Sequence, residues 1–334
     1  MFAYVIKRLL AGLLVVLLVS MMVFALFWYG PKSPAKPICD ADRGNRGCSG
    51  EILEGYEERL GYNNPITEEY TAWLKGVFVG RTFELGTATI ECPAPCLGIS
   101  YRTRIPVYET LKERLPATIS IAIGGATLYL LVGVTVGVAA ARRRGTLADK
   151  SLVGGSLFMS SIPYYLVALL AMLYLCIVYG IFERGYVSIA DGGIDGWFTH
   201  LLLPWLVLGI YGSTQYTRYS RGAMVESLNE DYIRTARAKG LAQRTVTYKH
   251  ALRSALVPVV TIFGIDFAFL LAGTIFTEYI FEIQGIGRWG LDATYDKDLP
   301  VVQATVLFGS IIIVLANIIV DVLYSVLDPR VRLT

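Results

Sequence analysis

Residues 231–241 read DYIRTARAKGL, a short basic stretch set between two long apolar runs, Leu201–Tyr216 and Val257–Tyr279. This contrast is typical of a polar loop between membrane spans. The whole chain agrees, because 54% of its 334 residues are hydrophobic. Only 17% are charged, against about 25% in soluble domains. The sequence therefore predicts a membrane protein, and its net charge of +3 is too small to indicate nucleic-acid binding.

The basic stretch itself has the pattern of a short helix. Weakly apolar residues recur on one face of that helix: Tyr232, Ile233, Ala236 and Gly240. The other positions carry positive charge: Arg234, Arg237 and Lys239. Ser227 and Glu230 have the spacing of a capping box, and Gly240 is a suitable stop. On this pattern alone, the helix is either solvated or held at lipid headgroups by its charge.

Six apolar runs are long enough, or nearly so, to cross a bilayer as helices. They are Leu9–Tyr29, Ala117–Ala141, Leu152–Ile181, Leu201–Tyr216, Val257–Tyr279 and Val301–Leu327. Pro116 and Pro204 stand near the starts of the second and fourth runs, and Pro163 interrupts the third. Gly133 and Gly137 have the spacing that permits close helix approach. The sequence predicts an all-α polytopic membrane protein with six transmembrane helices.

The first run is longer than a signal-peptide core and ends in aromatic residues, so we expect a retained span. Orientation follows from basic residues in the short loops. They cluster before the first run, at Arg142–Arg144 and across residues 218–255, whereas the loops Phe182–His200 and Glu278–Pro300 lack such an excess. This alternation predicts six spans with both termini in the cytoplasm.

The same topology places residues 30–115 outside the membrane. We expect a small extracytoplasmic cap that follows a first span at residues 1–29 and precedes a five-helix core at residues 116–334. Glu51–Arg59 and Thr67–Phe78 have helical patterns. Prolines predict an extended or turn-like start to the cap: Pro31, Pro34 and Pro37.

Four of the five cysteines lie in this cap: Cys39, Cys48, Cys92 and Cys96. An even number of cysteines on an oxidising face favours two disulfides, with three possible connectivities. We expect Cys39–Cys48 and Cys92–Cys96, because partners near in sequence meet most often. A zinc or iron–sulfur site is the alternative, which the oxidising side disfavours. The fifth, Cys176, is expected to be a buried apolar residue.

Residues 285–290 (GIGRWG) match the G-x-G-x-x-G pattern, but a dinucleotide site needs a βαβ unit around it. We interpret these glycines instead as a tight, strained turn back toward the membrane. No G-x-x-x-x-G-K-S/T phosphate loop occurs in the sequence, so a chain that pumps must take its energy from another subunit. No nucleophile–base or metal-ligand motif occurs either, so no enzyme activity, catalytic residue or metal site is predicted.

Polar residues inside the runs are further candidates: Asp266, Asn317 and Asp321. A central aspartate costs about 2.5–3.5 kcal/mol to insert, so it faces protein or water. For Asp266 two roles are open: it lines a path or holds a substrate ammonium, or it hydrogen-bonds to a neighbouring helix. His200 and His250 are expected to be hydrogen-bonded structural residues.

The string at 231–241 closely resembles the cytoplasmic coupling loop of binding-protein-dependent ABC importer permeases, in its dipeptide and oligopeptide form. The general family pattern is Glu-Ala-Ala, three residues, then Gly; here Arg234-Thr-Ala236 and Gly240 take those places. The resemblance extends to RLPAT at 114–118, to Arg218-x-x-Arg221 and to LDPRVR at 327–332. It includes EYIF at 278–281 followed by GIG at 285–287, with Gln284 where the family usually has proline. The cysteine-bearing pieces of the cap look like insertions.

This resemblance implies the type I ABC importer permease fold and a prokaryotic inner-membrane location. It implies that the loop helix sits in a cleft of a cytoplasmic ATP-binding subunit. The coupling residues it implies are Asp231, Tyr232, Arg234, Thr235, Ala236, Arg237, Ala238, Lys239, Gly240 and Leu241. It also implies a second homologous permease subunit and an extracytoplasmic peptide-binding protein. ATP and Mg²⁺ would be bound by partner subunits, with no cofactor in this chain.

Two alternatives remain open from the sequence. A stand-alone channel or ion-coupled transporter would use Asp266 as an ion or proton site and need no soluble partner. Within the family, close relatives handle glutathione, nickel chelates and certain sugars as well as peptides of different length. Co-purification with ATPase subunits distinguishes an ABC permease from a stand-alone transporter.

Overall fold

The computed structural model describes residues 2–29, 35–43, 47–59, 61–85 and 88–327, with the side chains of residues 2–5, 27, 37, 41–43, 85, 88 and 321–327 outside the description. The chain forms two compact units. The first unit comprises residues 1–5, 117–284 and 315–334, and the second comprises residues 6–116 and 285–314. Three of the four boundaries between the units fall inside long helices, and the fourth falls between Gln284 and Gly285, outside any helix.

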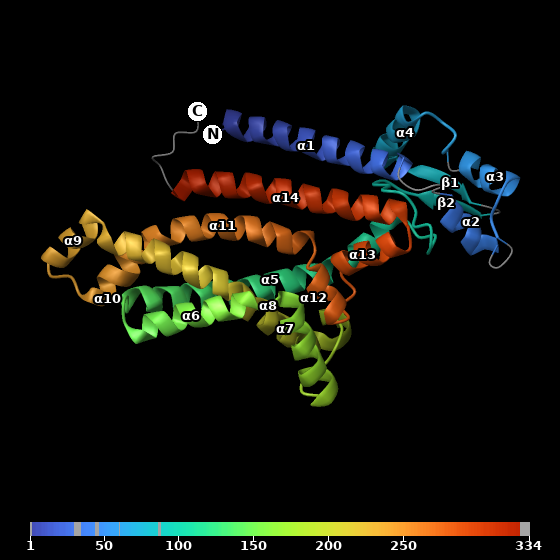
Figure 1. Cartoon of the computed structure of the whole chain (residues 1–334). Helices are drawn as coiled ribbons and strands as arrows, with labels where there is room; N and C mark the ends of the chain where they lie inside the picture. The colour runs from blue at the N-terminus through green and yellow to red at the C-terminus, as the bar shows by residue number, and fades with distance from the viewer. Residues whose placement is uncertain (1, 30–34, 44–46, 60, 86–87, 328–334) are drawn as a thin grey trace. The chain divides into compact units, whose positions relative to one another are not determined.

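Five described helical segments are long and apolar enough to cross a membrane, and a bent helix pair brings the number to six. The helices of the core are α1 (Phe2–Tyr29), α5 (Val107–Arg142), α6 (Leu147–Ser161), α7 (Tyr164–Ala171), π-helical η2 (Met172–Val178), α8 (Ile189–Asn229), α9 (Asp231–Ala238), α10 (Gln243–Thr245), π-helical η3 (Val246–Ala251), α11 (Leu252–Ala272), α12 (Ile275–Ile280), α13 (Ile286–Tyr295) and α14 (Leu299–Leu327) (Figure 1). The prediction of a helical polytopic protein is confirmed.

The third apolar run forms the bent pair. α6 ends at Ser161, Pro163 precedes α7, and the two segments differ in direction by 88°. Proline at this position has no N–H to donate and disfavours a helical conformation at the residue before it, so it breaks the run. The predicted interruption at Pro163 is confirmed.

Helix boundaries differ from those predicted in several runs, most clearly in the second, fourth and fifth. α5 begins at Val107 and carries Pro116 inside it; α8 begins at Ile189, is kinked at Gly193 (φ 68°, ψ −174°) and carries Pro204 further along. Proline interrupts the backbone ladder of a membrane helix without ending it when neighbouring groups satisfy the freed carbonyl. The fifth run does not extend to Tyr279 as one helix: α11 stops at Ala272, because Gly273 has a φ of +138° that a helix cannot contain.

Glycines let α5 and α8 approach closely in the first unit. A Cβ atom on Gly133 would clash with Tyr216, and one on Gly137 would lie 2.7 Å from the carbonyl oxygen of Thr217. Trp205 of α8 also donates from Nε1 to the backbone oxygen of Ser120, at 2.9 Å. The predicted close approach at Gly133 and Gly137 is confirmed.

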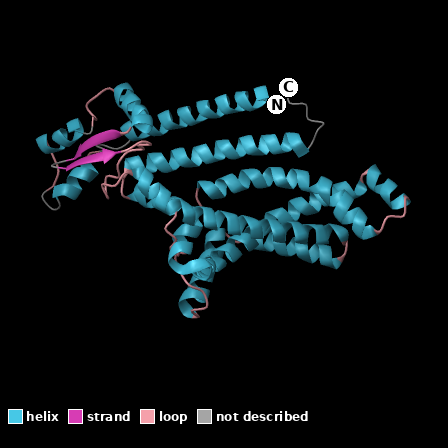
Figure 2. Cartoon of the chain, turned by 180° about the vertical axis from the view of Figure 1, so that it is seen from behind, coloured by secondary structure: helices cyan, strands magenta, loops and turns pink. Residues whose placement is uncertain are grey.

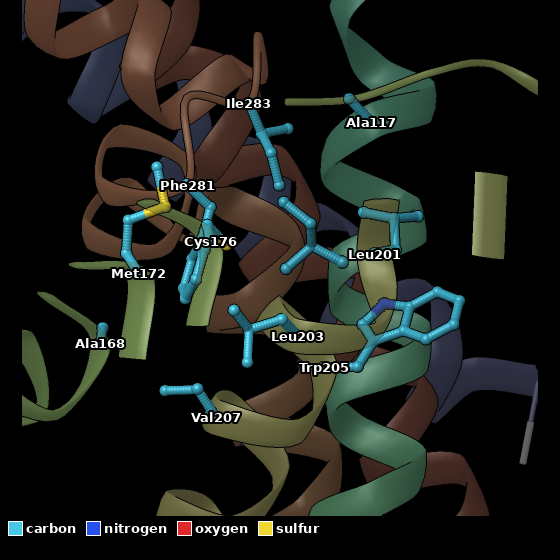
Figure 3. Packing of buried hydrophobic residues seen from close by; sticks show 11 residues of the cluster. Ala117, Ala168, Met172, Cys176, Leu201, Leu203, Trp205, Val207, Phe281 and Ile283 are labelled. Atoms are coloured by element: carbon cyan, nitrogen blue, oxygen red, sulfur yellow. The ribbon is translucent and has the colours of Figure 1, made fainter. Parts of the chain in front are cut away.

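A buried apolar cluster holds the bent pair against α5 and α8 (Figure 3). Ala168 and Met172 come from the bent pair, and Leu201 and Trp205 come from α8. Ile283, which follows α12, is fully buried in the same cluster. These contacts fix the bend at Pro163 inside the first unit.

The second unit contains residues 35–116, which form a small mixed structure (Figure 2). Its elements are α2 (Lys36–Arg43), α3 (Glu51–Arg59), α4 (Ile66–Val79), β1 (Arg81–Leu85) and β2 (Ala88–Cys92). The two predicted helices, α3 and α4, are confirmed. The prediction of a non-helical start is wrong at Pro37, which lies in the first turn of α2, where a missing N–H costs nothing. Pro31 and Pro34 lie outside the described residues.

An antiparallel hairpin joins β1 to β2, with Phe83 opposite Ile90. The structure pairs Cys39 with Cys48 and Cys92 with Cys96, the two near-neighbour pairs that the sequence spacing favours. Their Cα–Cα separations are 5.9 and 5.4 Å, within the ordinary range for disulfides. All four sulfur-bearing residues are buried.

The G-x-G-x-x-G match is part of a helix. Gly285 precedes α13 with φ −94° and ψ −177°, and Gly287 and Gly290 lie inside α13. The predicted strained turn is therefore wrong, because none of the three adopts a left-handed backbone. A Cβ on Gly290 would lie 2.9 Å from Thr305 Oγ1 of α14, so this glycine serves helix packing. No βαβ unit surrounds the match within the described residues.

Candidate functional site

The basic stretch forms α9, which lies at one end of the first unit beside α10 (Figure 1). A single extended residue, Glu230 with φ −65° and ψ 147°, separates α8 from α9. The predicted capping box is wrong: Ser227 is a buried residue of the last turn of α8, and Glu230 holds the N-cap position without a side-chain bond. The chain therefore turns sharply from a long span into α9.

Two side chains anchor α9 to the first unit. Ile233 is fully buried and Ala236, one turn later, is 7% exposed. Both join an apolar cluster with Met224 of α8 and Val246 of η3. Burying an isoleucine side chain contributes about 1.5–3 kcal/mol, so Ile233 is the main anchor. Tyr232 was predicted on the same face but is 44% exposed.

A Schellman motif ends α9 at the predicted glycine. The Gly240 N–H donates to the oxygen of Arg237 at 2.9 Å, and the Leu241 N–H donates to that of Ala236 at 3.4 Å. Gly240 has a φ of +76°, with open space around the position of a Cβ atom. Glycine is needed here for its backbone conformation and not for lack of room.

The remaining residues of 231–241 form an exposed surface. Arg234 pairs with Asp231 at 3.3 Å on the open face of the helix. Within the described part of the chain, Arg237 and Lys239 form no ion pair and are exposed. Tyr232 and Leu241 add apolar area, at 44% and 41% exposed. A mixed basic and apolar helix held at only two buried points is suited to docking in a protein cleft.

An ion pair between a buried aspartate and a partly exposed arginine braces the helices that lead into this surface. Arg221 of α8 donates from Nε and Nη2 to the two carboxylate oxygens of Asp149, at 2.6 and 2.7 Å. Gly145 N also donates to Asp149, and the Thr146 hydroxyl caps the N-terminus of α6. Such a bidentate pair fixes both distance and orientation. It locks α6 to α8.

The sequence reasoning did not single out Asp149. A signal was present, because Thr146 and Asp149 have the spacing of an N-cap followed by an acidic N3 residue. Three consecutive arginines, Arg142–Arg144, stand one residue before Thr146, and they indicate only a positively charged loop.

Asp266 makes an interhelical hydrogen bond. The Tyr216 hydroxyl of α8 donates to its Oδ2 at 2.7 Å, which ties α8 to α11. Of the two roles that the sequence leaves open for Asp266, this contact corresponds to the hydrogen bond to a neighbouring helix. Asn317 is exposed on α14 and is not brought to Asp266 by any described hydrogen bond, and the side chain of Asp321 lies outside the described residues.

Glu278 is a buried acid that sequence reasoning misplaced. The sequence places it at the start of the loop Glu278–Pro300, but it is fully buried in α12 and accepts a hydrogen bond from Thr118 Oγ1 at 2.8 Å. A second threonine, Thr274, lies 3.5 Å away on the same turn. The signal was its place inside an apolar hexapeptide, Ile275–Ile280. Glu278 joins α12 to α5.

The structure places His200 and Cys176 in the surroundings that the sequence predicts for them. His200 lies 2.8 Å from the Gly196 oxygen through Nδ1 and 3.0 Å from Glu183 through Nε2, so it is a hydrogen-bonded structural residue. Cys176 is buried and free in η2. Among the described residues, no group of three or more His, Cys, Asp or Glu is placed to hold a metal ion.

Residues 133–333 match the family described as binding-protein-dependent transport system inner membrane component, and residues 1–122 match its N-terminal family. A probable peptide ABC transporter permease of Sinorhizobium fredii is 33% identical over 98% of this chain and 99% of its own. The dipeptide transport system permease protein DppB of Escherichia coli K12 is 35% identical over 94% of both.

A solved structure shares the fold. The MetNI methionine ABC transporter, in an inward-facing form, aligns with a TM-score of 0.54 over 66% of this chain and 97% of that one, at 16% identity. The family match covers the bent pair, α9 and the helices on both sides of it. The chain belongs to the family of inner membrane components of binding-protein-dependent ABC transport systems.

Proposed function

We propose that this chain is the permease subunit of an ATP-driven peptide importer, in which ATP-binding subunits bind the exposed face of α9. The observation that carries the proposal is the construction of α9 itself. Two buried residues fix it to the bundle, while its basic and apolar outer face stays open. A helix of this kind transmits force, because a load on its exposed face reaches α8 and η3 through Ile233 and Ala236.

The coupling has a simple energetic requirement. A partner shifts the permease between two states only if it binds α9 differently in each. α9 continues from α8 through one residue, and α8 is locked to α6 by Asp149 and Arg221. A displacement of α9 would therefore be shared by two long helices. A second permease subunit related to this chain would complete the path.

The peptide substrate is supported by the relatives. The similar proteins from Sinorhizobium, Brucella and Escherichia coli are named peptide or dipeptide permeases. In this proposal an extracytoplasmic binding protein delivers peptide to residues 30–115 and the loops near α12 and α13. Both termini and α9 lie in the cytoplasm of a prokaryotic cell, as the basic loops indicate.

Charge reversal on α9 tests the proposal. In the variant Arg237→Glu with Lys239→Glu, two exposed cations that make no described ion pair change sign, so the fold is preserved. We expect the ATP-binding subunits to be lost from the purified complex at moderate salt. The matched control reverses Arg143 and Arg144, two exposed cations on the loop between α5 and α6. Equal retention of ATPase in both variants would refute docking at α9.

A further inference from the structure

The second unit contains a cavity of ≈ 90 Å³ that coupling at α9 does not use. Its walls come from α1, α4, β1, residues 97–101 and the start of α14. Most of the lining is apolar or aromatic, including Phe24 and Trp28 of α1 and Trp73 of α4. Aromatic packing holds these walls in place, since the Phe24 ring stacks on Trp28 at 5.7 Å and lies 6.3 Å from Trp73.

One wall carries a buried hydrogen-bond donor without a described acceptor. Gln303 of α14 is 7% exposed and lines the cavity. Its Nε2 is buried and has no partner among the described residues. A buried amide without an acceptor is costly, so this position favours an occupant that brings a carbonyl oxygen.

The other polar side chains that line the cavity already have partners in the protein. Arg81 Nη2 donates to Glu69 at 3.0 Å, and Asn64 donates to the same carboxylate at 2.9 Å. The Tyr62 and Tyr101 hydroxyls bond to each other at 2.7 Å. Burial raises the pKa of Tyr62 to about 12, so this pair is uncharged at neutral pH. The cavity therefore favours a neutral occupant over a charged terminus or side chain.

The volume of the cavity limits the size of the group that it can bind. A dry cavity of about 150 Å³ holds a benzene ring, so ≈ 90 Å³ suits a smaller aliphatic group. A whole lipid acyl chain is too large for this volume. A short branched side chain beside a carbonyl group satisfies the volume, the apolar walls and the Gln303 amide together.

We infer that the cavity is a binding subsite for one uncharged aliphatic side chain of a peptide, whose neighbouring carbonyl oxygen accepts from Gln303. The inference rests on the proposed function in one respect: an importer would bring peptides to this side of the membrane. Binding of the aliphatic side chain depends only on the residues that line the cavity. Leucine-sized residues are preferred, and lysine, glutamate and glycine are not.

The test uses the full chain in lipid nanodiscs with N-acetyl-leucinamide as the probe. Trp28 and Trp73 line the cavity, so tryptophan fluorescence reports on its occupation. We expect a saturable change with N-acetyl-leucinamide and a much smaller one with N-acetyl-glycinamide or N-acetyl-lysinamide. Gln303→Leu removes the donor and should weaken binding about tenfold, as expected for a buried hydrogen bond.

The matched control is Gln215→Leu, which makes the same change on an exposed residue of α8. Its binding should equal that of the unaltered chain. A second variant, Leu97→Trp, fills the cavity and should abolish binding even if Gln303→Leu folds poorly. The inference is overturned if no saturable change occurs, if blocked glycine binds equally well, or if Gln303→Leu and Gln215→Leu behave alike.

A second arm identifies the source of the side chain. The titration is repeated with the peptide-free external binding protein present in excess. Competition with N-acetyl-leucinamide assigns the occupant to a loop of that protein, and unchanged binding assigns it to the transported peptide. No ATP or ATPase enters this measurement, so its failure is distinct from failure of the importer proposal.

Discussion

At the scale of single residues, Gly240 shows how backbone geometry determines the end of α9. Its φ of +76° is reserved largely for glycine, and the space around it is open. The sequence predicted this stop correctly, because glycine after a helical pattern is a strong local signal. It could not predict which helix face is buried, because Ile233 and Tyr232 are both apolar and only tertiary packing separates them.

Gly240→Val should abolish uptake while leaving ATP hydrolysis running in the assembled complex. A left-handed non-glycine residue costs about 1–3 kcal/mol, and a β-branched side chain tolerates it poorly, so the end of α9 would rearrange. Gly240→Asn should retain most uptake, because asparagine adopts this conformation more readily. The ratio of peptide imported to ATP hydrolysed measures the effect.

The matched control for that substitution is Gly180→Val. Gly180 has a φ of +62° and equally open surroundings, but it follows η2 and lies outside the Asp149–Arg221 contacts. Its variant carries the same backbone strain away from α9. Equal loss of coupling in both variants would show that strain in any loop suffices and that α9 has no special role.

At the scale of elements, the long spans follow from apolar runs, whereas their ends do not. Proline was expected to open α5 and α8, yet Pro116 and Pro204 lie inside them. Local rules place proline at a helix start, but packing in a membrane bundle permits it further along. The β1–β2 hairpin was missed although Phe83 and Ile90 alternate with polar neighbours, because five-residue strands give a weak signal.

The start of α14 gives a pH-dependent prediction. Asp298 accepts from Ser100 Oγ at 2.5 Å and from the Tyr101 N–H at 3.0 Å, which ties residues 100–102 to α14. Burial raises the pKa of Asp298 above its ordinary value. The folded state therefore binds this proton more tightly than the unfolded state does, so the contribution of Asp298 to stability is complete below its unfolded pKa and declines as pH rises through the folded one.

Asp298→Asn removes that titration. Denaturation midpoints of the original chain should fall relative to those of the variant as pH rises from about 4 toward neutrality. The comparison uses the full chain in one detergent, with both proteins measured across the same pH series. A constant difference between the two midpoints at all pH values would contradict a raised pKa for Asp298.

At the scale of the whole molecule, the chain has an exposed basic helix, α9, but no phosphate-binding loop in its sequence. The family and the type of fold could be predicted from residues 231–241 and the six apolar runs. The pair Asp149–Arg221, the buried Glu278 and the cavity beside Gln303 could not, since each joins residues far apart in the sequence. Such contacts depend on helix packing that no local pattern encodes.

Peptide uptake by reconstituted liposomes tests most directly whether transport by this chain depends on separate ATP-binding subunits. Labelled peptide is offered to liposomes that hold this chain alone, and to liposomes that hold it with the second permease, the ATP-binding subunits and the binding protein. ATP-dependent accumulation in the complete system and none with the single chain is the predicted result. Accumulation by the chain alone, driven by an ion gradient or by no added energy, would contradict it.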